Sequence, residues 1–469
     1  MYVSISIDDA KDVLEKVLKK GIDIGFVRLQ ENIYETIVFD SGTLRAYNTS
    51  RVVGIGIKVV IGNGIGYGYT TSLDRDSIEK AIDRAIAMAK AMARYGRKKS
   101  LAPIESVKDR YRVEYKVNPL DIDPETKAKL VQEVNTETMK IKGIVSAVTR
   151  YSYEYDRRII VSSEGIEVET VVHGVGFGHM AIAKSGTVAE RVSDSKSFIG
   201  GYEYIEKTDW YSFASEINEL AIKASQAHTP SPGTYVAIID NELIGIMLHE
   251  AFGHASEGDG IVAEASVLRG KIGEKIASEL VTIVDEGVVE GGYPVPYDDE
   301  GTPKRRTIIV ENGILKHYLH SRDTATELNQ RPTGNARAQD ITFDVLVRQT
   351  NYYMMPRDWR VEELFKDVKF GIYLKGRGAM GGQVNPSVGT FTFSIGPSYI
   401  VRNGEIVELV RGVVVSGNIL ETLREVDAVA NDLKILTSVF GGCGKGGQRV
   451  RVGFGGPHVR TKKIVVGSG

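Results

Sequence analysis

Two histidines and a glutamate lie close together in the segment LIGIMLHEAFGHASEGDG, residues 243–260. His249 and Glu250 are adjacent, and His254 follows after three intervening residues. A glutamate directly after the first of two histidines is typical of zinc hydrolases, because neutral imidazoles bind the ion and the carboxylate takes a proton from water. The pattern predicts a Zn2+ hydrolase with Glu250 as general base. The alternative is a buried helix whose histidines bond to backbone carbonyls.

The spacing of the two histidines predicts a distorted helix. Side chains five residues apart diverge by about 140° on a regular helix, whereas four residues give about 40°. His249 and His254 therefore reach one ion only if the helix widens by one residue, as in a π-bulge, or ends before His254. Gly253 immediately precedes His254, and its backbone freedom lowers the cost of either distortion.

A catalytic zinc needs a third protein ligand, with a further position left for water. Six other histidines do not cluster with the motif: His173, His179, His228, His317, His320 and His458. Cys443 lies in the glycine-rich segment VFGGCGKGGQRV, residues 439–450, where small neighbours permit close approach to an ion. From its residue type alone, Cys443 is more often an ordinary buried cysteine. Glu257 and Asp259 would either orient the histidines or be solvated loop charges.

The N-terminal half shows one order of elements twice. The first series is a helix over 7–20, strands over 24–29, 33–39 and 52–61, and a helix over 78–92 capped by Asp74 or Asp76. The second is a helix over 126–139, strands over 144–153, 158–161, 168–183 and 197–204, and a helix from Thr208 or Asp209 to Ala227. We therefore expect residues 1–228 to form an α+β domain of two similar units, about 1–100 and 120–228, although such an order also recurs by chance.

The second half is predicted to be rich in short strands. A linker at 229–233 holds two prolines and a glycine, and Asn-Gly pairs at 312–313 and 403–404 predict hairpins. One late helix is expected over 420–435. Residues 229–469 should then form a β-rich sandwich or barrel-like domain in which the metal-binding helix is embedded.

Composition excludes several functional classes. The 59 Lys and Arg residues nearly balance the 61 Asp and Glu residues, which argues against a nucleic-acid-coating surface. A single cysteine excludes an intrachain disulfide and favours the cytoplasm. No apolar run approaches the roughly 18 residues of a membrane span, and the N-terminal segment is acidic where a signal peptide would be apolar.

Several motifs together resemble the TldD/PmbA family of intracellular zinc metallopeptidases. The resemblance extends in order over nearly the whole chain, in SRVVGIGIKVVIGNGIGYGYTTSLD (50–74), MLHEAFGHASEGD (247–259), DDEGTP (298–303), RQTNYYM (348–354), GGQVNPSVGTFTFS (381–394) and GGCGKGGQ (441–448). This resemblance is far more specific than the histidine motif alone.

The resemblance implies particular roles. His249, His254 and Cys443 would bind Zn2+, and Glu250 would activate the water. Because these positions are retained, the chain is similar to the metal-binding TldD-type members rather than to the TldE/PmbA-type members that lack them. Family members act on small or unfolded peptides as dimers, so a homodimer or a heterodimer with a TldE/PmbA-type paralogue is expected. The segment 381–394 would offer a strand edge to an extended peptide, unless it is sheet core.

Two other functions compete with a peptidase. One is a non-catalytic binding or regulatory subunit of a TldD/TldE-type complex, including a modulator of a nucleic-acid enzyme. The other is a structural zinc site. A binding subunit has no need of a full His-Glu-His-Cys set, the near-neutral charge disfavours DNA binding, and a structural zinc normally has four protein ligands.

Overall fold

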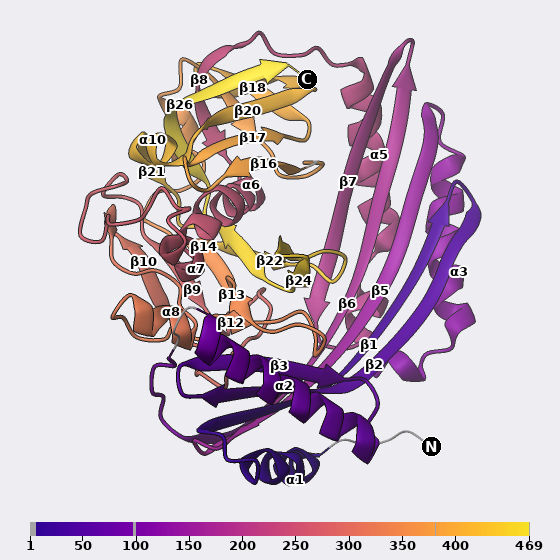
Figure 1. Ribbon diagram of the computed structural model, residues 1–469. Helices are drawn as coiled ribbons and strands as arrows, with labels where there is room; N and C mark the ends of the chain where they lie inside the picture. The colour runs from indigo at the N-terminus through magenta and orange to yellow at the C-terminus, as the bar shows by residue number, and fades with distance from the viewer. Residues whose placement is uncertain (1–5, 97–99, 380, 469) are drawn as a thin grey trace.

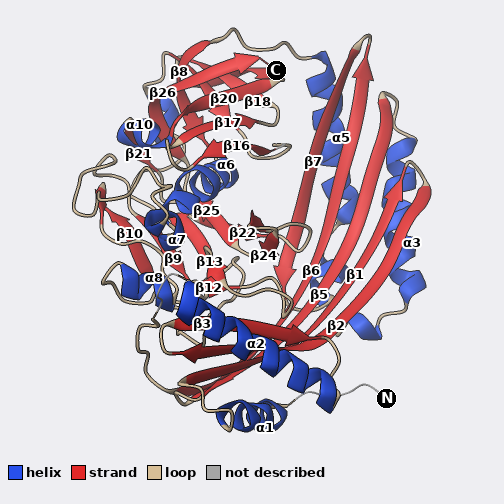
Figure 2. Cartoon of the chain, in the orientation of Figure 1, coloured by secondary structure: helices blue, strands red, loops and turns tan. Residues whose placement is uncertain are grey.

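A computed structural model describes residues 6–96, 100–379 and 381–468. Long strands of one large sheet form one side of the molecule, and smaller sheets of the second half form the other (Figure 1). Figure 2 shows that strands dominate both halves and that helices cover the outer face of the large sheet. The predicted α+β class is confirmed. In the described residues, no helix has both the length and the apolar character needed to cross a membrane.

The first half contributes a single seven-stranded sheet. Its elements are α1 (Ile7–Leu18), β1 (Ile24–Asp40), β2 (Thr43–Ile61), β3 (Gly64–Thr70), α2 (Arg75–Tyr95), β4 (Val107–Arg112), η1 (Pro119–Asp121), α3 (Pro124–Met139), β5 (Ile144–Ser162), β6 (Ile166–Ser185), β7 (Val188–Ile199), α4 (Glu203–Lys207) and α5 (Trp210–Gln226). The order is β3-β2-β1-β5-β6-β4, with β7 also paired to β6. The antiparallel pair β1–β5 joins the two predicted units edge to edge. We propose that these units, about 1–100 and 120–228, form one domain.

Capping residues define the helix starts in this half. The Asp74 side chain accepts a hydrogen bond from the Ser77 amide at 2.9 Å and begins α2, and Asp209 caps α5 in the same way. The predicted strands 24–29 and 33–39 are one strand, because the intervening Asn32 continues the ladder and pairs with β2 and β5. The strands predicted over 144–153 and 158–161 likewise merge into β5.

The strand predicted over 197–204 is partly wrong. Strand β7 ends at Ile199, and Gly200 then adopts a φ of 144°, a backbone conformation that residues with side chains rarely take. The chain then continues into the short helix α4, which contains Tyr204.

The second half forms two main sheets. Its elements are β8 (Gly233–Ile239), α6 (Asn241–Met247), η2 (Leu248–Gly253), η3 (His254–Ser256), α7 (Gly258–Val262), β9 (Ile283–Glu286), β10 (Thr307–Glu311), β11 (Ile314–Leu315), α8 (Arg322–Glu327), β12 (Ala336–Arg337), β13 (Leu346–Val347), β14 (Asn351–Met354), α9 (Glu363–Lys366), β15 (Phe370–Leu374), β16 (Gly381–Asn385), β17 (Thr390–Ser394), β18 (Ser398–Arg402), β19 (Glu405–Val410), β20 (Val413–Asn418), α10 (Ile419–Arg424), β21 (Val426–Val429), β22 (Lys434–Thr437), β23 (Cys443–Lys445), β24 (Gln448–Val450), β25 (Gly453–Gly456) and β26 (Val459–Ser468).

These two sheets share one hydrophobic core with the helical segment α6–η2. The nine-stranded sheet runs β16-β17-β20-β26-β8-β15-β18-β19, with β21 on β26, and the six-stranded sheet runs β11-β10-β9-β14-β25-β22. Leu248 and Phe252 of the helical segment are buried in this core. The described strands form no closed barrel, so the barrel-like alternative is not found. We propose that this half, residues 229–469, is the second domain.

Both turn predictions are confirmed, whereas the prediction of the late helix is partly wrong. Asn312-Gly313 and Asn403-Gly404 join β10 to β11 and β18 to β19, with positive φ at all four residues as a type I′ hairpin requires. The helix predicted over 420–435 is wrong after Arg424. Val426 lies in β21 instead, and Ile435 lies in β22. Val426 and Val429 are buried against β26, and β-branched residues suit such a strand.

Buried ion pairs join the two halves. The loop containing Asp299 and Glu300 contacts the large sheet, where Arg158 Nη1 lies 2.7 Å and 2.8 Å from the two Asp299 carboxylate oxygens. Lys58 Nζ lies 2.9 Å from Glu300 Oε1. These pairs join the large sheet to the second half, which carries the histidine motif.

Candidate metal centre and active site

The helix carrying the histidine motif has the predicted distortion. Helix α6 ends at Met247, a π-helical turn follows over Leu248–Gly253, and a 3-10 turn begins at His254. The wider turn offsets the five-residue spacing, and the ring centroids of His249 and His254 are 5.4 Å apart. The sequence therefore predicts both the need for the distortion and its place.

Gly253 is required for a different reason from the one expected. Its φ and ψ of −61° and −47° are ordinary helical values, so backbone freedom is not used. A Cβ atom there would lie 2.2 Å from Gln349 Oε1. The buried Gln349 uses this space to donate from Nε2 to the His249 carbonyl at 3.0 Å. Sequence reasoning missed Gln349, whose only signal is its place in the RQTNYYM segment.

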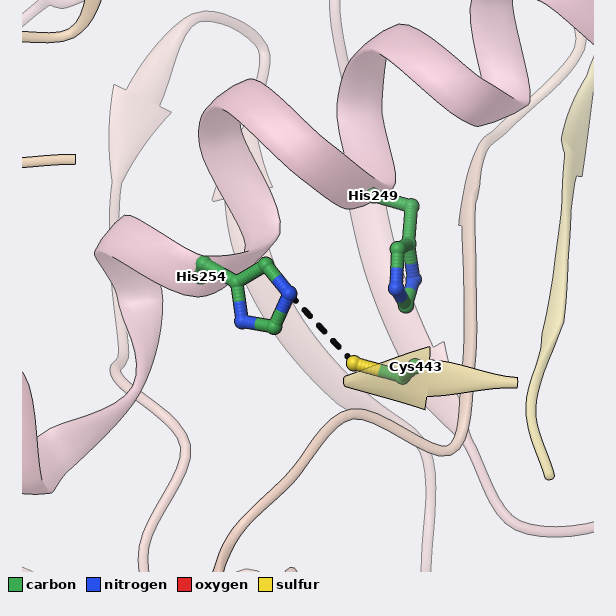
Figure 3. Close-up of side chains that lie close together, drawn as sticks. All are labelled: His249, His254 and Cys443. Carbon is green, nitrogen blue, oxygen red and sulfur yellow. Dashed lines mark hydrogen bonds between the residues drawn. The ribbon is translucent and has the colours of Figure 1, made fainter. Parts of the chain in front are cut away.

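The structure brings His249, His254 and Cys443 together. Cys443 lies at the start of β23, and its Sγ is 3.3 Å from His254 Nε2. One ligand atom from each residue can be chosen so that all lie within 4.8 Å of one another (Figure 3). None of the other six histidines belongs to a group of this kind in the described part of the chain. Both rings approach the sulfur from the distorted helix, as Figure 3 shows.

Glu257 and Lys445 hold His254 in place. His254 Nδ1 donates to Glu257 Oε2 at 3.0 Å, which leaves Nε2 directed toward Cys443. Lys445 Nζ donates to the same Glu257 oxygen at 2.7 Å and to Asp259 Oδ1 at 2.7 Å. Glu257 thus orients a candidate ligand, and Asp259 binds the lysine. Neither acid is a merely solvated charge, and Lys445 was not predicted from the sequence.

The electrostatics of the metal-free site favour a thiolate. Burial raises the pKa of the Cys443 thiol, but His249 and His254 outweigh burial and hold that pKa at about 5. Burial lowers the pKa of His254, yet the Glu257 carboxylate and the Cys443 sulfur raise it to about 11. At neutral pH the sulfur is therefore charged, which is the form that binds a metal ion.

Glu250 lines the same cavity as two of the candidate ligands, His249 and Cys443. This cavity, of about 140 Å³, is bounded by Ile246, His249, Glu250, Ser438, Gly441, Gly442, Cys443, Val452 and Phe454. A carboxylate, the His249 imidazole and the Cys443 sulfur thus line one otherwise apolar space. Such a site can hold a metal ion and a water molecule beside a carboxylate base.

The fully buried Arg348 supports the strand that carries the cysteine. Its Nη2 donates to the Cys443 carbonyl, so this guanidinium fixes the backbone from which Sγ projects. Like Gln349 beside it, Arg348 was not predicted as a site residue.

Comparisons with known proteins agree with this geometry. Family models described as PmbA/TldA metallopeptidase domain 1, central domain and C-terminal domain match residues 26–89, 117–225 and 232–468. A metalloprotease of Methanocaldococcus jannaschii is 36% identical over 96% of this chain and 98% of its own. A zinc metalloprotease TldD homolog of Saccharolobus solfataricus is 32% identical over 96% and 99%.

Solved structures show the same fold. A Thermotoga maritima protein proposed as a modulator of a DNA gyrase has a TM-score of 0.80 at 22% identity, over 98% of this chain and 100% of that one. TldE from Thermococcus kodakarensis has a TM-score of 0.77 at 19% identity, over 98% and 100%. The three family models and the metalloprotease relatives confirm the resemblance stated from the motifs. The chain belongs to the PmbA/TldD family and is a metallopeptidase.

Proposed function

We propose that the chain is a zinc-dependent peptidase that hydrolyses small or unfolded peptides, with Glu250 as general base. The observation that carries this proposal is that the candidate ligand atoms of His249, His254 and Cys443 lie within 4.8 Å of one another, and that Glu250 lines a cavity together with His249 and Cys443. A relative named as a zinc metalloprotease supports the choice of metal.

The side chains present fit Zn2+. Two imidazole nitrogens and one thiolate are ligands that zinc prefers. His249 Nδ1 is buried and has no hydrogen-bond partner among the described residues, as expected of an imidazole whose contacts are incomplete without an ion. Three protein ligands leave one position open, which favours a catalytic site over a structural one.

Glu250 would move the proton during hydrolysis. Zn2+ held by the three ligands would polarise water and the peptide carbonyl. The Glu250 carboxylate is half-buried and lines the cavity with His249 and Cys443. It would accept a proton from the attacking water and return it to the leaving amine. Gln349 and Glu257 would keep the two histidines in position throughout.

Strand β16 is the proposed place for the substrate backbone. It pairs with β17 at one edge of the nine-stranded sheet, and among the described strands it has no other partner. It also lies beside the π-helical turn η2. An extended peptide could add to this edge through main-chain hydrogen bonds, which would give broad sequence tolerance and exclude folded chains.

The partner and compartment are part of the same proposal. We propose a cytoplasmic dimer, formed with a second copy or with a TldE/PmbA-type paralogue. The alternative, a non-catalytic regulatory subunit, would not need Glu250 or the three ligands. Light scattering of the purified chain, alone and with a coexpressed paralogue, tests the assembly.

The activity is tested with Glu250→Gln and His249→Ala. We expect the wild-type protein to cleave short and unfolded peptides and to leave a folded protein intact. Glu250→Gln should lower the cleavage rate about 10²–10⁴-fold and keep the metal, whereas His249→Ala should lose both. Wild-type rates in the Glu250→Gln variant would contradict the role of the base.

A further inference from the structure

A second cavity lies beside the metal centre. It has a volume of about 280 Å³ and lies between strands β5, β6 and β7 on one side and helix α6 with residues 376–379 on the other. Ile246 lines both this cavity and the one at the metal centre. We call it the arginine cavity, after Arg150 and Arg191 on its wall. A peptide bound at the metal centre would therefore lie next to this cavity.

The side chain of Arg150 is held flat across the sheet. Arg150 pairs with Gly178 on β6, and a Cβ atom at Gly178 would lie 3.0 Å from Arg150 Nε. The missing side chain therefore leaves the space that Arg150 occupies. Its guanidinium carbon lies 4.2 Å from the ring centroid of Phe440, three residues before Cys443. Stacking on an aromatic ring fixes the guanidinium plane and leaves its N–H edge available.

Arg191 adds a second positive charge on the same sheet face. It pairs with Ile182, which is four residues along β6 from Gly178 and so projects to the same side. Burial lowers the pKa of Arg150, and the charge of Arg191 lowers it further. The two guanidinium groups are thus close enough to repel one another.

Neither arginine is neutralised within the cavity. Among the described residues, neither one forms an ion pair, and the cavity acid Asp194 is bound by Arg377 at 2.8 Å. Burial raises the pKa of Glu242, the other cavity acid, to about 7, so at neutral pH it is only partly charged. The cavity therefore has two cations, of which Arg150 is oriented by stacking, and in the described part of the chain no fully charged acid is paired with either of them.

We propose that Arg150 and Arg191 bind a carboxylate of the peptide substrate, beside the bond to be cleaved. The proposal rests on the peptidase function above. A guanidinium edge binds a carboxylate through paired, charge-assisted hydrogen bonds. The carboxylate is either the C-terminus of the peptide or an Asp or Glu side chain.

Binding of matched peptides distinguishes these sources. The zinc-loaded Glu250→Gln protein is titrated with three labelled peptides of equal length: a neutral C-terminal amide, the same sequence as a free acid, and an amide with one internal Glu. At least one carboxylate peptide should bind about tenfold more tightly than the neutral amide. Preference for the free acid identifies the C-terminus, and preference for the Glu peptide identifies a side chain.

Variants assign that preference to the arginines. Arg150→Gln and Arg191→Gln should each reduce it, and Arg150→Lys should retain part of it, since a lysine keeps the charge but not the paired geometry. Arg402→Gln is the control, because Arg402 also stacks on a phenylalanine, 4.9 Å from the Phe370 ring, but lies on β18 away from this cavity. Arg402→Gln should leave the preference unchanged.

The carboxylate proposal and the proposed peptidase function can fail separately. If the wild-type protein cleaves the neutral amide but neither carboxylate peptide binds better, the carboxylate proposal is overturned and the peptidase function stands. If the zinc-loaded wild-type protein cleaves none of the three, the proposed function itself fails. A preference that persists in both Gln variants would also overturn the assignment to these arginines.

Discussion

Lys445 Nζ lies 2.7 Å from Glu257 Oε2, the same oxygen that accepts the hydrogen bond of His254. Lys445 stands two residues after Cys443 on β23, so this contact joins the strand that carries the thiolate to the helix end that carries the imidazole. The two segments are 188 residues apart in the chain. The relative position of two candidate ligands thus depends on a lysine that contacts neither of them.

Replacing Lys445 should weaken metal binding. Lys445→Met would remove a partner of the buried Glu257 carboxylate, so that His254 could tilt. The affinity for zinc should then fall about 10–100-fold. Competition with a zinc chelator measures it. Lys462→Met, at an exposed lysine, is the control and should not change the affinity. Equal affinities for the Lys445→Met and wild-type proteins would mean that the contact does not position the ligand.

Gly253→Ala should disturb the π-helical turn. The new Cβ would lie 2.2 Å from Gln349 Oε1, so one of the two groups must move. We expect a loss of about 1–3 kcal/mol in the free energy of unfolding, and weaker zinc binding. Chemical denaturation measures the first. Adding Gln349→Ala should recover part of the loss if the steric explanation is right, and further destabilisation would argue against it.

The reactivity of Cys443 should depend on pH in a way that reports its neighbours. Its folded pKa of about 5 lies below the ordinary 9.0, so the stability from thiolate formation is fully present above pH 9 and is lost as the pH falls toward 5. Because the chain has one cysteine, alkylation of the metal-free protein reports this group alone. The rate should fall only near pH 5, and bound zinc should suppress it. A midpoint near pH 9 would contradict the thiolate.

Asp299→Asn should destabilise the junction between the halves. It would remove one of the two carboxylate partners of the partly buried Arg158, Asp156 being the other, and should cost about 1–3 kcal/mol in the free energy of unfolding. Chemical denaturation measures the change. Glu219→Gln breaks an exposed pair with Lys223 and should change stability by less than about 1 kcal/mol. Similar small effects for both variants would show that the junction pairs do not hold the halves together.

The sequence indicates the candidate ligands and base of the site, but not the residues that hold them in position. The spacing of His249 and His254 alone demands a distorted helix, and the structure has one. A lone cysteine carries no geometric signal, so Cys443 was expected as a ligand only through the resemblance. Gln349 and Lys445 act across 100 and 188 residues of chain, and no local pattern marks such contacts.

The fold shows the same division between local and distant information. Asp74 and Asp209 are local signals, and the helices begin where those signals indicate. The stretch 420–435 carries apolar residues at spacings that suit a helix. Val426 instead pairs with Thr461 of β26 and is part of a strand. No pattern near Val426 in the sequence indicates that partner.

Zinc content is the most direct test of the central claim. Protein purified without added metal and analysed by elemental mass spectrometry should contain about one zinc per chain, since three ligands converge on one position. His249→Ala should lose the zinc, and Glu250→Gln should keep it. Absence of zinc from the wild-type chain even after anaerobic reconstitution, or its retention in His249→Ala, would contradict the metal centre described above.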